Sequence, residues 1–172
     1  MTGTPFFIEP LHRSHDRRSF DCGARPGDTV LTQYFREQIT QDVRRRVASC
    51  FVALAGDRRI AGYYTLAATG VPLTGLPEST RKKLPRYPSV PAVLMGRLAV
   101  GQEFRGQGLG GALLADALKR AIDSPIAAYA MFVEAKDDAS VAFYSHHGFI
   151  GMIDSAMKLF LPLETAKRIL KP

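Results

Sequence analysis

The segment RGQGLGG, Arg105–Gly111, contains four glycines and lies between two apolar stretches. It follows LMGRLAV (94–100) and precedes ALLADALKRAI (112–122). The first stretch is typical of a buried strand and the second of an amphipathic helix. Glycines at a helix start let the backbone approach a phosphate, to which the free N–H groups of the first turn donate. The segment therefore predicts a strand–loop–helix unit that binds a pyrophosphate.

One reading of this loop is a dinucleotide site, because Gly106, Gly108 and Gly111 match the pattern G-x-G-x-x-G. Glu134, at the end of the next predicted strand, stands where an acidic ribose ligand is expected. Only 38 residues follow Glu134, however, which is too short for the second half of a doubly wound sheet. Residues 102–105 also make the strand-to-glycine connection longer than the tight turn of the fingerprint. The sequence therefore favours a different pyrophosphate ligand.

Strand and helix patterns alternate along the rest of the chain and predict a single α/β (α+β) domain over residues 1–172. The predicted strands are 5–9, 50–56, 59–69, 93–100 and 128–135, with one or two more in 149–163. The predicted helices are a segment capped by Asp28 or Thr29 that runs to about residue 47, then 111–123, then 139–147 with a cap at Asp137 or Asp138 and an end at Gly148. Residues 71–91 contain five prolines and are not expected to form a long regular element.

Composition is that of a globular protein, with 46% hydrophobic and 23% charged residues. No apolar run approaches the roughly 18 residues of a membrane span, and no signal peptide is recognised. Two cysteines are too few for a disulfide framework. We therefore expect a cytoplasmic protein without a membrane association.

The net charge of +7 is concentrated in the middle of the chain. Residues 36–97 carry eleven basic and four acidic side chains, whereas basic and acidic side chains balance before and after this range. A localised basic excess is typical of a surface that binds an anionic partner such as nucleic acid, although a solvated basic face gives the same pattern.

Two motifs together resemble the Gcn-five-related N-acetyltransferases, the GNAT superfamily. LAV-x(4)-RGQGLG before an apolar helix resembles the family's first motif, and FYSHHGF (143–149) resembles its second signature, F-Y-x-x-x-G-F. The resemblance covers about residues 50–160. It implies a GNAT fold, which is a mixed, mostly antiparallel sheet flanked by helices, with acetyl-CoA in the opening between two parallel, splayed strands that end near Val100 and Ala135.

The resemblance also implies roles for particular residues. Backbone groups of Leu98 and Val100 would hold the thioester and pantetheine. The pyrophosphate would be held by Arg105, Gly106, Gly108, Gly110 and Gly111. Ser140 and Tyr144, one helical turn apart, would flank the thiol end, with the Tyr144 hydroxyl as the catalytic proton donor to the departing thiolate. The alternative for Tyr144 is a core aromatic whose hydroxyl is satisfied by a neighbour.

Other titratable groups give weaker signals. Glu134 is a candidate general base, but it lies on a strand expected to be buried. His146 and His147 occupy a helix C-terminus, where histidine is favourable for structural reasons. The histidines and cysteines form no metal-binding pattern, so no metal is expected.

A narrower resemblance concerns the acceptor amine. FDCG (20–23), QDVRRR (41–46), LPRYPSVPAVLMGRLAV (84–100), VEAKDD (133–138) and LFLPL (159–163) resemble the GNAT toxins of bacterial type II toxin–antitoxin pairs. That resemblance implies acetylation of the α-amine of aminoacyl-tRNA, inhibition of translation, a DNA-binding antitoxin partner and a homodimer. The basic residues expected to contact tRNA phosphates are Arg44, Arg45, Arg46, Arg81, Lys82, Lys83, Arg86 and Arg97.

Three functions remain open on the sequence. The first is this tRNA-directed toxin. The second is a GNAT acetyltransferase that acts on a small-molecule amine or a protein. The third is a non-catalytic nucleic-acid-binding module on a GNAT scaffold, and the combination of the glycine loop with Tyr144 argues against it.

Overall fold

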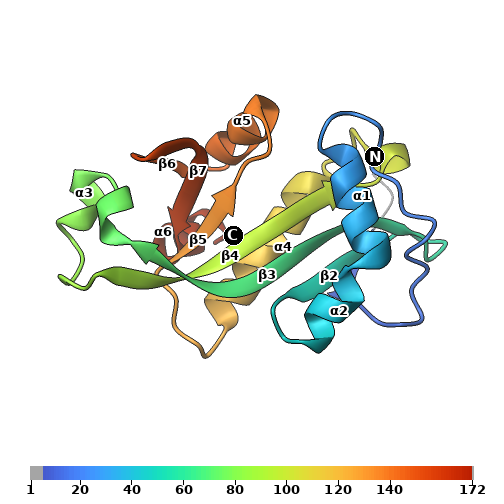
Figure 1. Ribbon diagram of the computed structural model, residues 1–172, viewed down its shortest axis with the longest axis horizontal. Coiled ribbons are helices and arrows are strands. Elements are labelled where there is room, and N and C mark those ends of the chain that lie inside the picture. The colour runs from blue at the N-terminus through green and yellow to red at the C-terminus, as the bar shows by residue number, and fades with distance from the viewer. Residues whose placement is uncertain (1–5, 172) are drawn as a thin grey trace. The chain divides into compact units, whose positions relative to one another are not determined.

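The computed structural model describes residues 6–171 and contains a seven-stranded sheet with the order β1-β2-β3-β4-β5-β7-β6 (Figure 1). The strands are β1 (Phe7–Pro10), β2 (Ser49–Leu54), β3 (Ile60–Pro72), β4 (Ser89–Val100), β5 (Ala130–Glu134), β6 (Ile150–Met152) and β7 (Ser155–Pro162). The pairs β1–β2, β2–β3, β5–β7 and β6–β7 are antiparallel, and β4–β5 is parallel. The expected mixed sheet with one parallel pair is confirmed, and Pro5 of the first predicted strand lies outside the described residues.

The helices are α1 (Asp28–Glu37), α2 (Ile39–Arg44), α3 (Glu78–Arg81), α4 (Leu109–Asp123), α5 (Asp138–His146) and α6 (Leu163–Ile169). Two short 3₁₀ turns, η1 (Leu73–Gly75) and η2 (Gln102–Phe104), complete the regular structure. The parallel strands β4 and β5 are joined through α4, the kind of long crossover that a parallel pair requires. None of the described helices is both long and apolar enough to cross a membrane.

The predicted helix from residue 28 to about 47 is wrong in two respects. It is interrupted at Gln38, so α1 and α2 are separate helices. The residue that caps α1 is Gly27, with φ 89°, rather than Asp28 or Thr29. Asp28 is the first helical residue, and its buried carboxylate binds groups outside the helix. At α5, by contrast, the expected cap is confirmed, because the Asp137 side chain accepts the Ser140 N–H.

The prediction for the middle of the chain is confirmed, and that for its end is incomplete. The proline-rich range 71–91 contains only the short elements η1 and α3 between the ends of β3 and β4, as expected. Helix α6, which follows Pro162 directly, was not predicted. Its seven residues follow a strand with no polar loop between them, so no turn signal separates the two elements in the sequence.

The described residues group into two compact units. Unit 1 contains the described residues up to Ala67 together with Gly96–Ala117, and unit 2 contains Ala68–Met95 together with the residues from Leu118 onward. Strands β3 and β4 and helix α4 contribute residues to both units. The assignment of residues 1–172 to one domain stays a prediction.

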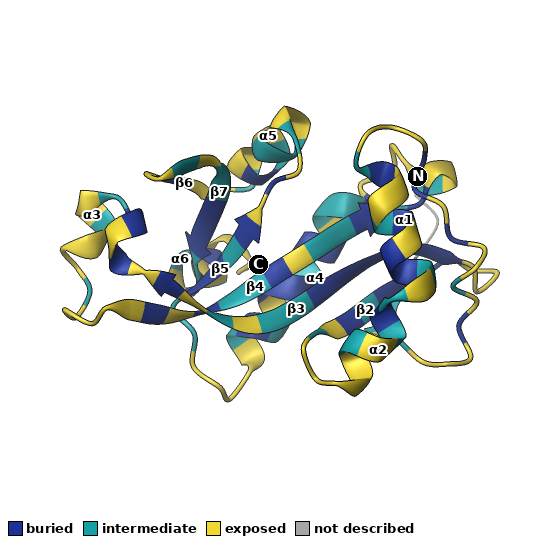
Figure 2. Cartoon of the chain, viewed as in Figure 1, coloured by how far each residue is buried: buried dark blue, intermediate teal, exposed yellow. Residues whose placement is uncertain are grey.

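In unit 1, helices α1 and α2 cover a face of β2 and β3, and these strands are mostly buried (Figure 2). An aromatic core packs on this face. Phe20, Phe35 and Tyr63 are almost fully buried, and the rings of Phe35 and Tyr63 stack with centroids 4.4 Å apart. The Tyr63 hydroxyl donates to the Leu31 carbonyl at 2.8 Å, so the buried polar group is satisfied. Gly62, the neighbour of Tyr63 on β3, faces Leu109 and Leu113 of α4, because adjacent residues of a strand point to opposite faces.

In unit 2, β5 lies between β4 and β7. Its register runs from Ala92 opposite Ala130 to Met95 opposite Val133 on the parallel side, and Phe132 is opposite Phe160 on the antiparallel side. A second core packs around these strands and consists of Val71, Leu73, Leu76, Val90, Ala92, Ala130, Met152 and Phe160. At its carboxyl end β5 stays paired with β7 up to Glu134 opposite Lys158, just before the chain continues to α5.

Gly62 supplies a test of the packing in unit 1. A Cβ at this position would lie 2.8 Å from the Ala99 carbonyl oxygen and 2.9 Å from Leu113 Cδ1. The backbone oxygen cannot give way, so we expect Gly62→Ala to lower the free energy of unfolding by about 1–3 kcal/mol in urea denaturation. Gly56→Ala is the matched control, since a Cβ there meets no atom within 4 Å. Equal stability of the two variants would contradict the close approach of β3 to α4.

Candidate active site

The glycine loop of unit 1 follows η2 and turns the chain into α4. Gly106 and Gly108 have φ values of 78° and 77°, a left-handed conformation that glycine adopts without steric cost. A Cβ on either residue would meet no atom within 4 Å. Backbone conformation rather than tight packing therefore requires glycine at these two positions.

The start of α4 presents unused backbone donors. The helix begins at Leu109, and the first N–H that it pairs near this end is that of Ala112, which donates to the Gly108 carbonyl at 3.1 Å. The N–H groups of Leu109, Gly110 and Gly111 precede that bond, and N–H groups in the first turn of a helix have no helical acceptor. Together with the positive end of the helix dipole, they suit an anionic group such as a phosphate.

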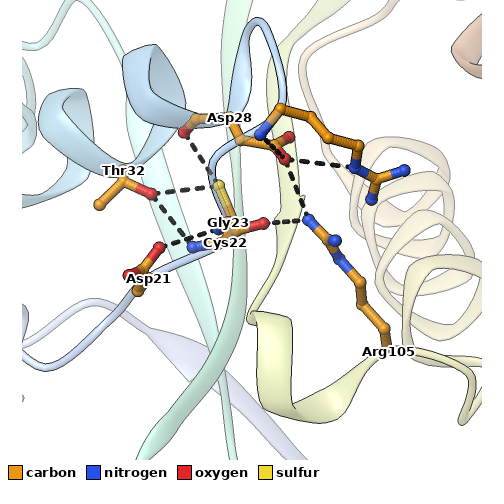
Figure 3. Close-up of polar contacts among 7 residues, drawn as sticks. Asp21, Cys22, Gly23, Asp28, Thr32 and Arg105 are labelled. Carbon is orange, nitrogen blue, oxygen red and sulfur yellow. Dashed lines mark hydrogen bonds and ion pairs between the residues drawn. The ribbon is translucent and has the colours of Figure 1, made fainter.

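The Arg105 side chain does not extend freely from this loop. Its Nη2 donates to the Cys22 carbonyl oxygen and forms an ion pair with the Asp28 carboxylate at 3.2 Å (Figure 3). The Arg105 side chain is 35% exposed, whereas that of Asp28 is 3% exposed. The guanidinium that the sequence placed among the pyrophosphate ligands thus contacts the segment before α1.

Leu98 and Val100, expected beside the thioester, lie in the last part of β4 in unit 1 and are partly exposed. Ala99 between them is buried in the aromatic core with Phe20 and Tyr63. Because side chains alternate along a strand, Leu98 and Val100 point to the face opposite that core.

Arg97 in the same strand stacks on an aromatic side chain of α1. Its guanidinium carbon lies 3.4 Å from the centre of the Tyr34 ring, a cation–π contact. The Tyr34 hydroxyl donates to the Asp42 carboxylate at 2.6 Å, and Gln38 donates to the other carboxylate oxygen at 3.1 Å. These hydrogen bonds, first that of Tyr34, lower the pKa of Asp42. Burial, followed by the hydrogen bond to Asp42, raises the pKa of Tyr34, so its hydroxyl stays neutral.

Arg44, Arg45 and Arg46 are exposed at the C-terminal end of α2 (Figure 2). Arg46 has a φ of 60°, and the Val47 N–H donates to the Asp42 carbonyl at 3.0 Å. This Schellman arrangement normally has glycine at the left-handed position, as Gly148 does at the end of α5. Within residues 6–171, none of these three arginines takes part in an ion pair.

Tyr144 lies on α5 in unit 2 and is 6% exposed. Its ring packs against Phe143 and Phe149. The buried tyrosines of unit 1, Tyr34, Tyr63 and Tyr64, all donate to carboxylate or carbonyl oxygens. No hydrogen bond of the Tyr144 hydroxyl, by contrast, exists among the residues that the structure describes. Burial raises the pKa of Tyr144, so its hydroxyl keeps its proton. The hydroxyl is therefore a neutral donor that no core acceptor occupies.

Neighbouring residues of unit 2 have mostly structural contacts. Ser140, one turn before Tyr144, is partly exposed, and its N–H is bound by the Asp137 cap. The His147 ring nitrogen Nδ1 lies 2.9 Å from the Phe143 carbonyl, as suits a residue at a helix C-terminus. Glu134 at the end of β5 is exposed rather than buried. The expectation of a buried strand is confirmed for most of β5, and Glu134 at its end is the exposed exception.

The second basic segment lies in unit 2 beside α3. Arg81, Lys82, Lys83 and Arg86 are all exposed. Arg81, Lys82 and Arg86 line a cavity of about 450 Å³ together with Leu73, Glu78, Leu84, Pro85 and Tyr87. Lys82 forms a 3.5 Å ion pair with Glu78, an exposed pair that contributes little to stability.

The structure thus gathers Leu98, Val100, Arg105 and the four glycines in unit 1, with Arg44–Arg46 and Arg97. Ser140, Tyr144 and the Arg81–Arg86 segment belong to unit 2. Sequence reasoning missed Gly23, Asp28 and Tyr34, which hold two of the predicted arginines. Only the pattern FDCG pointed to this region, and it gave no role to these residues.

Comparison with known proteins supplies the family. The model of the acetyltransferase (GNAT) family matches residues 11–149. The chain is 32% identical over 146 residues to a tRNA-acetylating toxin of Mycobacterium tuberculosis, covering 84% of this chain and 86% of that protein. It is 29% identical over 174 residues to a probable toxin TacT of Sinorhizobium fredii, covering 95% of this chain and 94% of that protein.

Solved structures show the same fold. A tyrosine-to-phenylalanine mutant of KacT has a TM-score of 0.87 at 28% identity, covering 96% of this chain and 99% of that one. AtaT complexed with acetyl-methionyl-tRNAfMet has a TM-score of 0.86 at 27% identity, covering 97% of this chain and all of that one, 100%. AtaTR bound with acetyl-CoA has a TM-score of 0.82 at 26% identity, covering 96% of this chain and 98% of that one. With a family model that matches most of its length, this chain belongs to the GNAT family of acetyl-CoA-dependent acetyltransferases.

Proposed function

We propose that this chain is a toxin that transfers the acetyl group of acetyl-CoA to the α-amine of an aminoacyl-tRNA and so blocks translation. The observation that carries the proposal is the 32% identity to a tRNA-acetylating toxin over 84% of the chain. The structural likeness to AtaT complexed with acetyl-methionyl-tRNAfMet supports the same substrate class.

Acetyl-CoA binds through the glycine loop in this proposal. The left-handed Gly106 and Gly108 and the first-turn N–H groups of Gly110 and Gly111 hold the pyrophosphate. Backbone groups of Leu98 and Val100 hold the pantetheine, and an N–H of this strand polarises the thioester carbonyl. A polarised carbonyl is the acceptor that a neutral amine needs in order to attack.

Tyr144 is the proposed catalytic residue. The amine nitrogen attacks the thioester carbon, the carbon–sulfur bond breaks, and the CoA sulfur leaves as a thiolate that requires a proton. The nitrogen releases one of its own protons as the amide forms, which balances the proton that the thiolate takes up. The Tyr144 hydroxyl is a neutral donor without a core acceptor, which suits it to hydrogen-bond that sulfur. Because burial raises the pKa of Tyr144 further above that of a thiol, the hydroxyl acts first as a hydrogen-bond donor to the developing thiolate. Its proton moves to the sulfur only as the proton released by the amine nitrogen replaces it.

The tRNA contacts in the proposal come from exposed arginines and lysines. Arg44, Arg45 and Arg46 lie at the end of α2, and the partly exposed Arg97 contacts the Tyr34 ring through its guanidinium. In unit 2, Arg81, Lys82, Lys83 and Arg86 supply further phosphate contacts. Each neutralised phosphate adds affinity that falls as salt rises.

The relatives also suggest how the protein is controlled. Since AtaT has been solved with the C-terminus of the antitoxin AtaR, and KacTA as a complex with DNA, we propose a partner antitoxin that binds DNA for this chain as well. We also propose a homodimer. A cytoplasmic location follows from the proposed substrate, because tRNA is cytoplasmic.

Labelled acetyl-CoA tests the activity directly. Purified protein should label charged tRNA and leave uncharged tRNA unlabelled, and Tyr144→Phe should reduce kcat by about 10²-fold or more, as expected on loss of a proton donor. The measurement is acid-precipitable label per unit time. The Tyr144→Phe protein should still bind acetyl-CoA, since its ring contacts with Phe143 and Phe149 remain.

The same assay separates the alternatives. A protein and metabolite extract free of tRNA is offered in parallel. Label in the extract but not on charged tRNA would identify an acetyltransferase of small amines or proteins. Binding of tRNA without any label, unchanged in Tyr144→Phe, would identify a non-catalytic module.

Arg46→Gly separates nucleic-acid binding from stability. Glycine relieves the left-handed strain at φ 60°, so the free energy of unfolding should rise by about 0.5–1 kcal/mol. Loss of one phosphate contact should at the same time weaken tRNA binding and reduce the slope of log Kd against log salt by about 1. Filter binding at several salt concentrations measures the tRNA affinity and its salt slope.

Arg58→Gly is the matched control. Arg58 is also exposed and left-handed, with φ 69°, in the turn between β2 and β3. The Arg58→Gly variant loses the same charge and relieves the same strain as Arg46→Gly. Its free energy of unfolding should therefore rise by a similar amount, while the slope of log Kd for tRNA against log salt stays unchanged. If both variants shift the slope equally, Arg46 acts only through net charge.

A further inference from the structure

We infer that Arg105 is a positioning residue, which holds the glycine loop against the segment Phe20–Gly23 through Asp28 and the Cys22 carbonyl, while backbone N–H groups alone contact the pyrophosphate. This inference rests on the proposed placement of acetyl-CoA at the glycine loop. It gives Asp28 and Gly23 a part in acetyl-CoA binding, although neither belongs to the loop.

The carboxylate of Asp28 is deeply buried. A carboxylate that is 3% exposed must be paired, because an isolated buried charge costs several kcal/mol. Arg25 also approaches Asp28 Oδ2, at 3.5 Å, but its side chain is 70% exposed. An exposed partner is screened by water, so the half-buried Arg105 is the stronger of these two cations. These contacts use Arg105 Nη2 and direct that end of the guanidinium toward Cys22 and Asp28.

The Arg105 guanidinium packs directly against the backbone of Gly23. A Cβ on Gly23 would lie 2.9 Å from Arg105 Nη2 and 3.0 Å from Asp28 Oδ2. Gly23 also has a φ of 119°, and its N–H donates to the Asp21 side chain at 2.8 Å (Figure 3). Both backbone conformation and space therefore require glycine where the guanidinium rests.

The contact between Arg105 and Cys22 is one of several that join the glycine loop and η2 to the segment Phe20–Gly23. The Gln102 N–H donates to the Asp21 carbonyl at 2.8 Å. The Cys22 N–H donates to Thr32 Oγ1 at 3.1 Å and its thiol donates to the Asp28 carbonyl at 3.1 Å, which fixes this segment to α1. Arg105 thus joins the glycine loop to a segment that α1 already holds in place.

Asp28→Asn tests the inference, because it removes the carboxylate and leaves every cation in place. If Arg105 is a positioning residue, the KM for acetyl-CoA should rise by about tenfold, equivalent to about 1.4 kcal/mol, with kcat and the KM for aminoacyl-tRNA unchanged. If Arg105 instead binds the pyrophosphate, releasing it from Asp28 should leave the KM for acetyl-CoA unchanged or lower it. That second result would overturn the inference.

Two further variants keep the test decisive if Asp28→Asn does not fold. Arg105→Lys keeps the positive charge but cannot span the Cys22 carbonyl and Asp28 together, so its KM for acetyl-CoA should rise by about the same factor. Gly23→Ala displaces the guanidinium without changing any charge and should do likewise. An unchanged KM in either folded variant would overturn the inference. Arg25→Gln, at the exposed partner of the same carboxylate, is the control and should keep the wild-type KM.

Calorimetric titration of the wild-type protein with acetyl-CoA separates this inference from the proposed function. If the wild type binds no acetyl-CoA, the placement of acetyl-CoA fails and the inference fails with it. If wild type and Asp28→Asn bind equally well, only the positioning role of Arg105 is overturned.

Discussion

The left-handed backbone at Gly106 and Gly108 is the constraint on which the candidate site depends. It turns the chain from η2 into α4 so abruptly that the helix begins with its first N–H groups next to the loop. A residue with a side chain would be strained at both positions, although space is available for one. Glycine is therefore needed at these positions for the left-handed backbone itself. That backbone leaves the first N–H groups of α4 side by side at the loop, an arrangement that suits an anion.

Patterns that depend on neighbouring residues were predictable from the sequence, and those that depend on distant ones were not. The loop, α4, the Asp137 cap and the Gly148 end of α5 all follow from spacing within a few residues. The cap of α1 did not, because Asp28 looks like an N-cap in sequence but is drawn into an ion pair with Arg105, 77 residues later. Likewise the exposed Glu134 ends a strand that is otherwise mostly buried, which its apolar neighbours concealed.

Formal charge overstates how many cations the protein offers to a partner. Arg36 in the basic middle of the chain donates its Nε to the Phe20 carbonyl at 2.9 Å, and Arg59 pairs with Asp57 and Glu103. These side chains stabilise turns and loop ends instead of facing a ligand. Arg97 represents a third case, because stacking on Tyr34 orients it without neutralising it. Counting basic residues locates the charge excess in the middle third of the chain but does not tell which of its side chains are available to a partner.

The end of α2 has a consequence for the local dynamics of the protein. A Schellman turn closed by Arg46 releases strain when it opens, whereas the one closed by Gly148 releases none. The last turn of α2 therefore opens at a lower free energy than the body of unit 1, and its amide protons exchange through local opening events. A polyanion seated on the three arginines would close that turn, so the segment that recognises the ligand would also be the segment that the ligand orders.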